Sequence, residues 1–196
     1  DLSQDTFIKV LNHIDRYSPE FKFSSWLFKI ANNVAIDHLR ALVAQVVEPI
    51  ARLGAVAFPA LDEILYAADG LGCWCNDRRM HVSEVSELKQ AVFTYTSWSG
   101  FRSTNRLAAF ERFHKECFFG RGWGDAYGYH MVATGRAEVM LDPVVNIWDV
   151  APFSPIFREA GGFFGSWNGE EGHTHGEGLA CNAALKPKVL ELIRGG

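Results

Sequence analysis

Signals that direct a chain to a membrane are missing from this sequence of 196 residues. No stretch approaches the roughly 20 consecutive apolar residues that a membrane-spanning helix needs. No signal-peptide pattern is present, and the first residue is Asp1 rather than Met. We therefore expect no membrane partner and a cytoplasmic location. The length can bury a substantial core as one folded unit or two.

Cysteine is scarce, and its spacing matches no zinc site. The four residues are Cys73, Cys75, Cys117 and Cys181. A Cys-x-Cys pair without a second close pair favours reduced thiols, in the core or at the surface. His173 and His175, within Gly-Glu-Glu-Gly-His-Thr-His-Gly, are expected in a solvated loop.

Glycine motifs that bind nucleotides are also absent. Neither Gly161-Gly162 nor Gly120-Arg121-Gly122 fits a P-loop or a Gly-x-Gly-x-x-Gly fingerprint after a strand, so both are interpreted as turns. The net charge of −4, with 15 Phe and 6 Trp residues, indicates a soluble globular protein.

The stretch 142–152 reads Asp-Pro-Val-Val-Asn-Ile-Trp-Asp-Val-Ala-Pro. It closely resembles the last active-site motif of the inositol monophosphatase family, whose Mg²⁺-dependent members include a histidinol-phosphate phosphatase branch. The resemblance runs from about residue 41 to residue 196. It implies that Asp149 is a metal ligand beside the substrate phosphate, and that Asp125 and Asp142 lie on the substrate side.

The form Gly-Asp-x-Tyr-Gly-Tyr at 124–129 looks like the histidinol-phosphate branch. Two earlier motifs of the family, a Glu-Glu helix and an Asp-Pro-Ile-Asp-Gly-Thr turn, do not occur in this sequence. Hydrolysis by clustered metals needs carboxylates from several chain segments. Asp149 alone can instead cap a helix. We therefore expect Asp125, Asp142 and Asp149 to be vestigial, with no functional catalytic residue, no required cofactor and at most a weak Mg²⁺ site.

Residues 1–40 resemble something else, region 2 of extracytoplasmic-function sigma factors. The resemblance rests on an acidic Leu-x-Gln-x-Thr-Phe start, on Ser-Ser-Trp-Leu-Phe at 24–28 and on Asn-x-x-x-Asp-x-x-Arg at 33–40. It implies that Asn33, Asp37 and Arg40 lie on or beside a DNA-reading face.

The charge of this segment argues against DNA binding. Residues 1–40 hold five acidic and five basic side chains, whereas affinity for nucleic acid rests largely on an excess of Lys and Arg. We expect neither nucleic acid nor RNA polymerase as a partner. The alternative is that the apolar side chains of two amphipathic helices simply pack on the rest of the chain.

Apolar periodicity places the elements. Helices are predicted over 6–17, from 24 or 25 to about 39, over 106–117, after the 124–129 motif to about 134, and over 149–160 and 188–194. Strands are predicted at 53–58, 64–68, 72–75, 92–96, 118–121, 137–141, 163–167 and 179–181. Residues 42–47 are expected to form a strand or to extend the preceding helix.

The sequence thus predicts an α/β fold, a truncated inositol-monophosphatase-like mixed sheet in segment 41–196, covered by two sigma-like helices from segment 1–40. The docking side chains are predicted to be Phe7, Leu11, Ile14, Trp26, Leu27 and Ile30. Uncovered apolar surface should drive self-association as a homodimer.

The leading functional hypothesis is a segment-recombined, engineered chimera without native activity. One alternative is a Mg²⁺-dependent phosphomonoesterase of the inositol monophosphatase or histidinol phosphatase type. The other is a sigma-like module that binds polymerase or DNA.

Overall fold

The structure is a computed structural model. It describes residues 8–18, 27, 30 and 51–195. The chain divides into two compact units, Asp1–Val47 and Glu48–Gly196, and each is described by itself. The predicted boundary after residue 40 and the behaviour of residues 42–47 stay predictions, because those positions lie outside the described residues.

In the first unit, residues 8–11 are helical and a 3-10 helix, η1, spans Ile14–Arg16. The single helix predicted over 6–17 is therefore interrupted within its described part. His13 Nδ1 donates to the Lys9 carbonyl at 2.9 Å, while the His13 backbone N–H bonds to Val10. This local side-chain bond competes with the regular helical pattern. Of the second predicted helix, only Leu27 and Ile30 are described, and both are helical.

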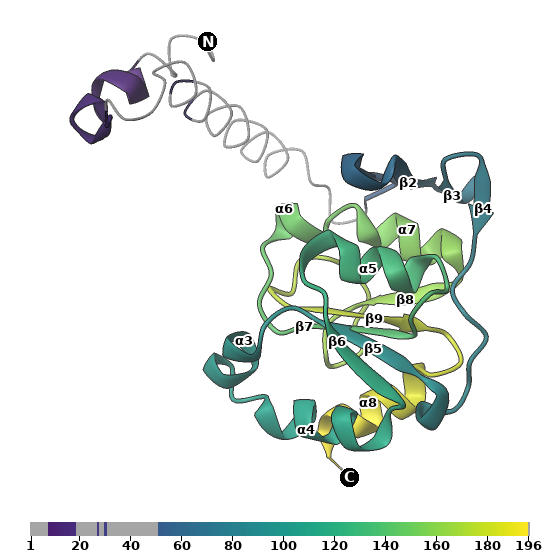
Figure 1. Ribbon diagram of the computed structural model, residues 1–196. Helices are drawn as coiled ribbons and strands as arrows, with labels where there is room; N and C mark the ends of the chain where they lie inside the picture. Colours follow the sequence, from purple (N-terminus) through teal and green to yellow (C-terminus); the bar gives the residue numbers. More distant parts are fainter. Residues whose placement is uncertain (1–7, 19–26, 28–29, 31–50, 196) are drawn as a thin grey trace. The chain divides into compact units, whose positions relative to one another are not determined.

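In the second unit, the first sheet is antiparallel and has the order β1-β2-β3-β4 (Figure 1). Its strands are β1 Leu53–Phe58, β2 Glu63–Ala68, β3 Gly72–Cys75 and β4 Arg78–Met80, with the 3-10 helix η2 Pro59–Leu61 between the first two. The first three strands confirm the prediction. The sequence reasoning missed β4 because Arg-Arg-Met offers no alternation.

The second sheet has five strands in the order β6-β5-β7-β9-β8. The strands are β5 Val92–Tyr95, β6 Phe119–Gly122, β7 Val139–Asp142, β8 Gly162–Gly165 and β9 Gly178–Asn182. Strand β5 is parallel to both β6 and β7, whereas β9 is antiparallel to β7 and β8. The parallel pairing brings the carboxyl ends of β5 and β7 to one edge, where the candidate site lies.

Helices cover both faces of this second sheet (Figure 1). Helices α5 Asp125–Ala133 and α7 Phe153–Ala160 lie between the two sheets, and α4 Leu107–Glu116 and α8 Lys186–Arg194 lie on the other face. Shorter elements are η3 Leu88–Gln90, α3 Trp98–Ser103 and α6 Ile147–Val150. The predicted α/β class is confirmed, although the strands form two sheets rather than one. No helix in the described part of the chain is long and apolar enough to cross a bilayer.

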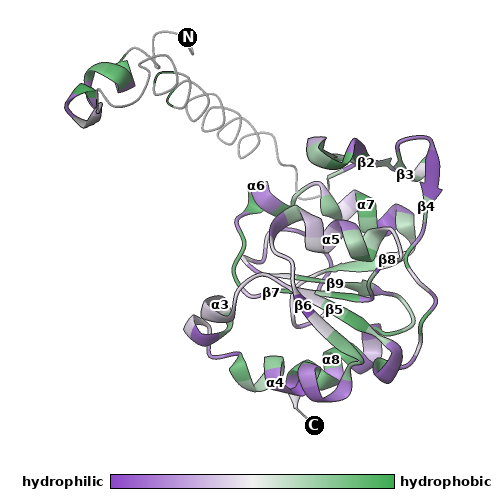
Figure 2. Cartoon of the chain, in the orientation of Figure 1, coloured by the Kyte–Doolittle hydropathy of each residue, from purple (hydrophilic) through white to green (hydrophobic). Residues whose placement is uncertain are grey.

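Each helical layer encloses an apolar core. The core between the sheets contains Leu65, Phe153 and Phe157, all fully buried, and the core under α4 and α8 contains Phe93 and Phe113. Burying one such side chain contributes roughly 1.5–3 kcal/mol to folding. Figure 2 shows apolar residues along the central strands and polar residues on β4. All four cysteines are free, buried thiols.

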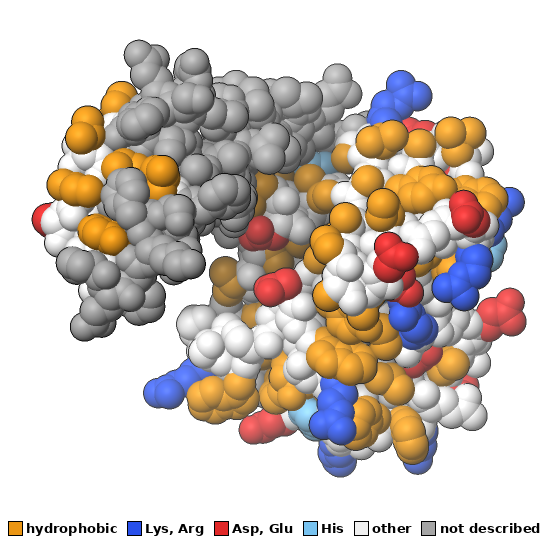
Figure 3. Space-filling model, turned by 45° about the horizontal axis from the view of Figure 1, so that its top comes forward, with side chains coloured by type: hydrophobic (Ala, Val, Ile, Leu, Met, Phe, Trp, Pro, Cys, Tyr) orange, Lys and Arg blue, Asp and Glu red, His pale blue; other side chains and the backbone are white. Residues whose placement is uncertain are grey.

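The outer face of the first sheet carries exposed apolar side chains. Leu53, Ile64 and Tyr66 are 72%, 51% and 40% exposed, and Figure 3 shows apolar side chains among charged ones on this side of the molecule. The predicted docking of the first two helices on this sheet stays a prediction, because the helices and the sheet belong to different units, each described by itself, and Phe7 and Trp26 lie outside the described residues.

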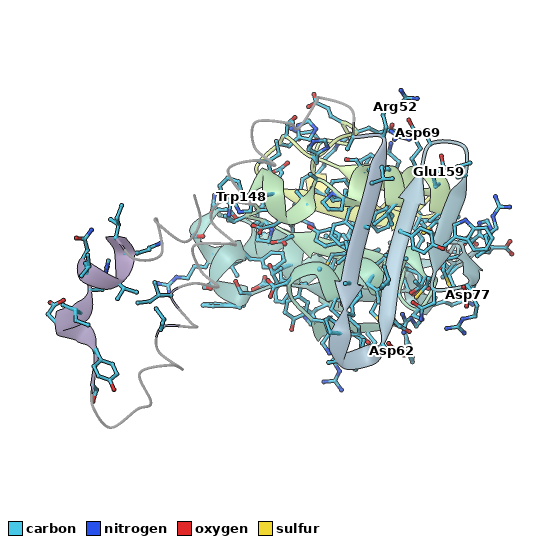
Figure 4. The ribbon with its side chains drawn as sticks, turned by 90° about the horizontal axis from the view of Figure 1, so that it is seen from above. Arg52, Asp62, Asp69, Asp77, Trp148 and Glu159 are labelled. Atoms are coloured by element: carbon cyan, nitrogen blue, oxygen red, sulfur yellow. The ribbon has the colours of Figure 1, made fainter. Side chains whose placement is uncertain are left out.

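Glu159 on α7 fixes the β2–β3 turn. Its two carboxylate oxygens accept the backbone N–H groups of Gly70 and Gly72, each at 2.8 Å. Asp69 in the same turn pairs with Arg158 at 2.6 Å and Arg52 at 3.2 Å. Figure 4 shows Arg52, Asp69 and Glu159 together at one end of the sheet. The turn is therefore tied to the helix below it by charge-assisted bonds.

Candidate active site

One cavity of about 330 Å³ contains all three aspartates singled out by the sequence. It opens where β5 and β7 end and where α5 and α6 begin. Its lining consists of Thr96, Ser97, Asp125, Ala126, Tyr129, Asp142, Val144, Val145, Asp149 and Val150. Because no Lys or Arg occurs in this described lining, the cavity is electronegative and favours a cation.

Asp142 lies at the base of the cavity and is 5% exposed. One carboxylate oxygen accepts the Thr96 hydroxyl at 2.9 Å, and the other accepts the Tyr129 hydroxyl at 3.4 Å. Burial raises the pKa of Asp142 to about 6, although the bonds from Thr96, the Val144 backbone and Tyr129 oppose this rise. Tyr129 is fully buried, and burial together with the neighbouring Asp142 raises its pKa well above the ordinary value.

Asp149 is exposed and lies in α6, not at the start of a helix that runs to residue 160. Asn146 is the N-cap, and Asp149 Oδ2 accepts its backbone N–H at 3.3 Å and its side-chain Nδ2 at 3.1 Å. The predicted single helix is wrong because Ala151 and Pro152 separate α6 from α7. The reciprocal capping interaction holds the Asp149 carboxylate at the cavity.

Asp125 is the first residue of α5 and has a φ of +57°, which is uncommon for a residue with a side chain. It is exposed at the same cavity. The strained backbone conformation is of the kind that the surrounding structure maintains at ligand sites. The amino-terminal end of α5 also favours negative charge nearby.

Three further lining residues had no predicted role. Thr96 and Ser97 directly follow β5, just as Asp142 ends β7, so the parallel pairing brings them together. Ser97 also caps α3 by accepting the Gly100 backbone N–H at 3.2 Å. Tyr129 belongs to the 124–129 motif. The sequence did carry a signal for these residues, because Thr96 ends the predicted strand 92–96 and the polar Ser97 directly follows it.

Two other sequence predictions concern positions away from the cavity. His173 is 1% exposed, not solvated, because its Nδ1 lies 3.0 Å from the Ser154 hydroxyl under the loop. The residues predicted to read DNA, Asn33, Asp37 and Arg40, lie outside the described residues.

The donor set of the cavity fits Mg²⁺, which prefers carboxylate oxygens and is often held by one or two carboxylates, waters and substrate phosphate. Asp149 and Asp125 are the exposed carboxylates of the cavity that could hold such an ion. The potential ligand atoms of the three aspartates do not all lie within 4.8 Å of one another. An ion here would therefore depend on water or substrate oxygens as well.

The fold and the cavity define an α/β protein with a carboxylate-lined cavity. Residues 36–195 match the inositol monophosphatase family, and the chain belongs to it. Residues 1–44 match Sigma-70 region 2.

Curated relatives include histidinol-phosphatases. The one from Chlorobaculum parvum is 33% identical over 156 residues, covering 79% of this chain and 60% of the relative. The one from Streptomyces coelicolor is 34% identical over 143 residues, covering 70% and 54%. Among solved structures, the IMPase of Thermotoga maritima matches with a TM-score of 0.65 and 30% identity, covering 73% of this chain and 56% of that one. The chain thus spans little more than half the length of these relatives.

Proposed function

We propose that this chain carries the substrate-binding half of a Mg²⁺-dependent phosphomonoesterase site. In this proposal Asp149 holds the ion, and Asp125 and Asp142 bind the organic part of the substrate. The supporting observation is the convergence of three carboxylates, from three separate elements, on one cavity without a basic side chain in its described lining. A phosphate can enter such a cavity only together with a cation, because it would otherwise meet uncompensated negative charge.

The substrate class is a small phosphomonoester with hydrogen-bond donors or a positive charge on its alcohol part. Histidinol phosphate fits, since its ammonium group can pair with a carboxylate. The relatives named histidinol-phosphatase and the Gly-Asp-x-Tyr-Gly-Tyr motif support this choice. The cavity volume of about 330 Å³ lies at the lower end of small-ligand sites.

Binding is expected without efficient turnover. A bound Mg²⁺ would polarise the phosphate, but phosphomonoester hydrolysis by clustered ions needs a carboxylate set that three separated aspartates do not supply. This sequence contains neither the Glu-Glu helix nor the Asp-Pro-Ile-Asp-Gly-Thr turn. We therefore propose a chain that binds the Mg²⁺–phosphomonoester pair and releases little inorganic phosphate.

Calorimetry and phosphate release test this function together. We expect histidinol phosphate to bind only with Mg²⁺, and Asp149→Asn to abolish binding. Asp77→Asn is the matched control, since Asp77 is an exposed aspartate in the β3–β4 turn (Figure 4). Binding that needs no Mg²⁺, or that survives Asp149→Asn, would refute the site. Rapid turnover lost in Asp149→Asn would refute only the expected lack of hydrolysis.

We also make proposals about the origin of the chain and its assembly. We propose a chimera of two incomplete parents, with segments 1–40 and 41–196, that self-associates as a homodimer in the cytoplasm. A natural genomic reading frame across the junction would contradict an engineered origin, and a compact monomer in concentrated sedimentation runs would contradict the dimer.

A second candidate function, promoter DNA binding, rests on the match of residues 1–44 to Sigma-70 region 2. We expect no binding, because acidic and basic residues balance over 1–40. Filter retention of a promoter fragment at low salt, lost on Arg40→Ala, would favour this second function instead.

A further inference from the structure

A second cluster of chemically competent side chains lies between the first sheet and α5. Glu63 begins β2, Cys75 ends β3 and His130 lies in α5. One potential ligand atom from each residue lies within 4.8 Å of the other two. In the described part of the chain, no other three His, Cys, Asp or Glu side chains meet this criterion. None of the three lines the aspartate cavity.

The strand register produces this cluster. Glu63 and Leu65 alternate onto the inner face of β2, and Leu65 pairs with Cys75 on β3. The side chains of Glu63 and Cys75 therefore both face the helix layer, where His130 is fully buried. Cys75 is 1% exposed and forms no disulfide. Ligands on two strands and a helix are held more rigidly than ligands on loops.

The contacts of His130 do not match one another when no metal ion is bound. Its Nε2 lies 2.6 Å from a Glu63 oxygen and 2.5 Å from an Arg136 guanidinium nitrogen. The nitrogen can donate to the carboxylate or accept from the guanidinium, but it cannot do both. Its other ring nitrogen, Nδ1, is buried and has no hydrogen-bond partner. A metal ion would accept the Nε2 lone pair and the carboxylate charge together.

We propose that Glu63, Cys75 and His130 form a binding site for a Zn²⁺-like transition-metal ion, with Arg136 displaced when the ion binds. One imidazole, one thiolate and one carboxylate are the ligand types that zinc takes in tetrahedral sites, and water can fill the fourth position. Zinc bonds of about 2.0–2.3 Å place ligand atoms roughly 3.5 Å apart, so Glu63 and His130 separate by about 1 Å on binding. Arg136 is 39% exposed and can turn toward solvent.

Burial of the ligands favours metal binding at His130 and opposes it at Cys75. Burial lowers the pKa of His130, which keeps the imidazole neutral and able to bind metal. Burial raises the pKa of the Cys75 thiol, so the ion must displace a proton from sulfur. Metal affinity should therefore increase with pH.

Cobalt titration of the untagged full chain, under a reductant that does not bind metal, tests this site. We expect one Co²⁺ per chain, a thiolate-to-cobalt charge-transfer band, and loss of the band when one equivalent of Zn²⁺ is added. Cys75→Ser should abolish the band. Cys73→Ser is the matched control, since Cys73 is a buried thiol on the same face of the same strand, and it should keep the band.

A wild-type chain without a saturable band, or a band that survives Cys75→Ser, would overturn the proposal and leave an ion-pair network only. Circular dichroism of both variants in chelator checks that they fold. Arg136→Gln provides a variant at a more exposed position, and removing this positive charge should tighten Co²⁺ binding several-fold. Weaker or unchanged binding would contradict the displacement of Arg136.

Discussion

Replacing Asp142 with Asn tests whether the base of the aspartate cavity holds an unfavourable buried charge. The carboxylate is 5% exposed, and its pKa is raised from 3.8 to about 6. Because the pKa is higher in the folded state, Asp142 favours folding only while it is protonated. Its contribution to the free energy of unfolding is fully present below about pH 4 and is lost as the pH rises through about 6. A shift of this size corresponds to about 3 kcal/mol once the group is fully ionised.

The pH dependence gives a sharper signature than the absolute stability. The raised pKa of Asp142 lowers the free energy of unfolding by about 1.6 kcal/mol at pH 5, where the folded group is mostly protonated, and by about 3 kcal/mol at pH 8, where it is ionised. Asn cannot ionise, so the free energy of unfolding of Asp142→Asn relative to wild type should rise by about 1.4 kcal/mol between these values. Asn also loses acceptor capacity toward Tyr129 and the Val144 backbone, at a cost of about 1 kcal/mol per bond, and this cost hardly changes with pH.

Urea unfolding in chelator at pH 5 and pH 8 measures this difference. Histidines that titrate in the same range are present in both proteins, so their effect cancels. Asp149→Asn is the control, because it removes a carboxylate of the same cavity from an exposed position and should change stability by at most about 1 kcal/mol. A wild-type advantage over Asp142→Asn that grows toward pH 8 would refute the reasoning.

Four further substitutions test the packing that positions the cavity. Gly54→Ala should destabilise the protein strongly, because the added Cβ would lie 2.1 Å from the Pro152 carbonyl oxygen. Gly161→Ala is the comparison: the added Cβ would meet no atom within 4 Å, and the φ of +79° should cost only about 1–2 kcal/mol in thermal unfolding. Glu159→Gln should lower the free energy of unfolding by about 1–2 kcal/mol, because an amide replaces one of the two acceptors for the β2–β3 turn. Phe157→Ala should cost about 3–5 kcal/mol by urea unfolding, because the ring is fully buried. Equal effects of the two glycine variants, or neutral effects at Glu159 and Phe157, would contradict these contacts.

The sequence predicted long, regular elements better than short ones. Alternation located β5, and the periodicity of Leu107, Phe110 and Phe113 located α4, whose apolar side packs on the core beneath it. Strand β7 was located as an apolar run and contributes to both cores. Helix α3 and strand β4 were missed because six and three residues give no measurable period. The break between α6 and α7 was also missed, although Pro152 was visible in the sequence.

The candidate site was predicted only in part. Asp125, Asp142 and Asp149 came from a motif resemblance, and the structure brings them to one cavity. Thr96 and Ser97 were not singled out, because their place beside Asp142 depends on parallel pairing between β5 and β7, which alternation does not reveal. His173 was assigned to solvent from its polar neighbours, yet its bond to Ser154 depends on packing against α7.

Magnesium-dependent binding of histidinol phosphate to the intact chain tests the central claim most directly. The account predicts saturable binding by calorimetry that requires Mg²⁺, disappears in Asp149→Asn and persists in Asp77→Asn. Equal affinity in the presence of Mg²⁺ and of chelator, or undiminished binding by Asp149→Asn, would contradict it.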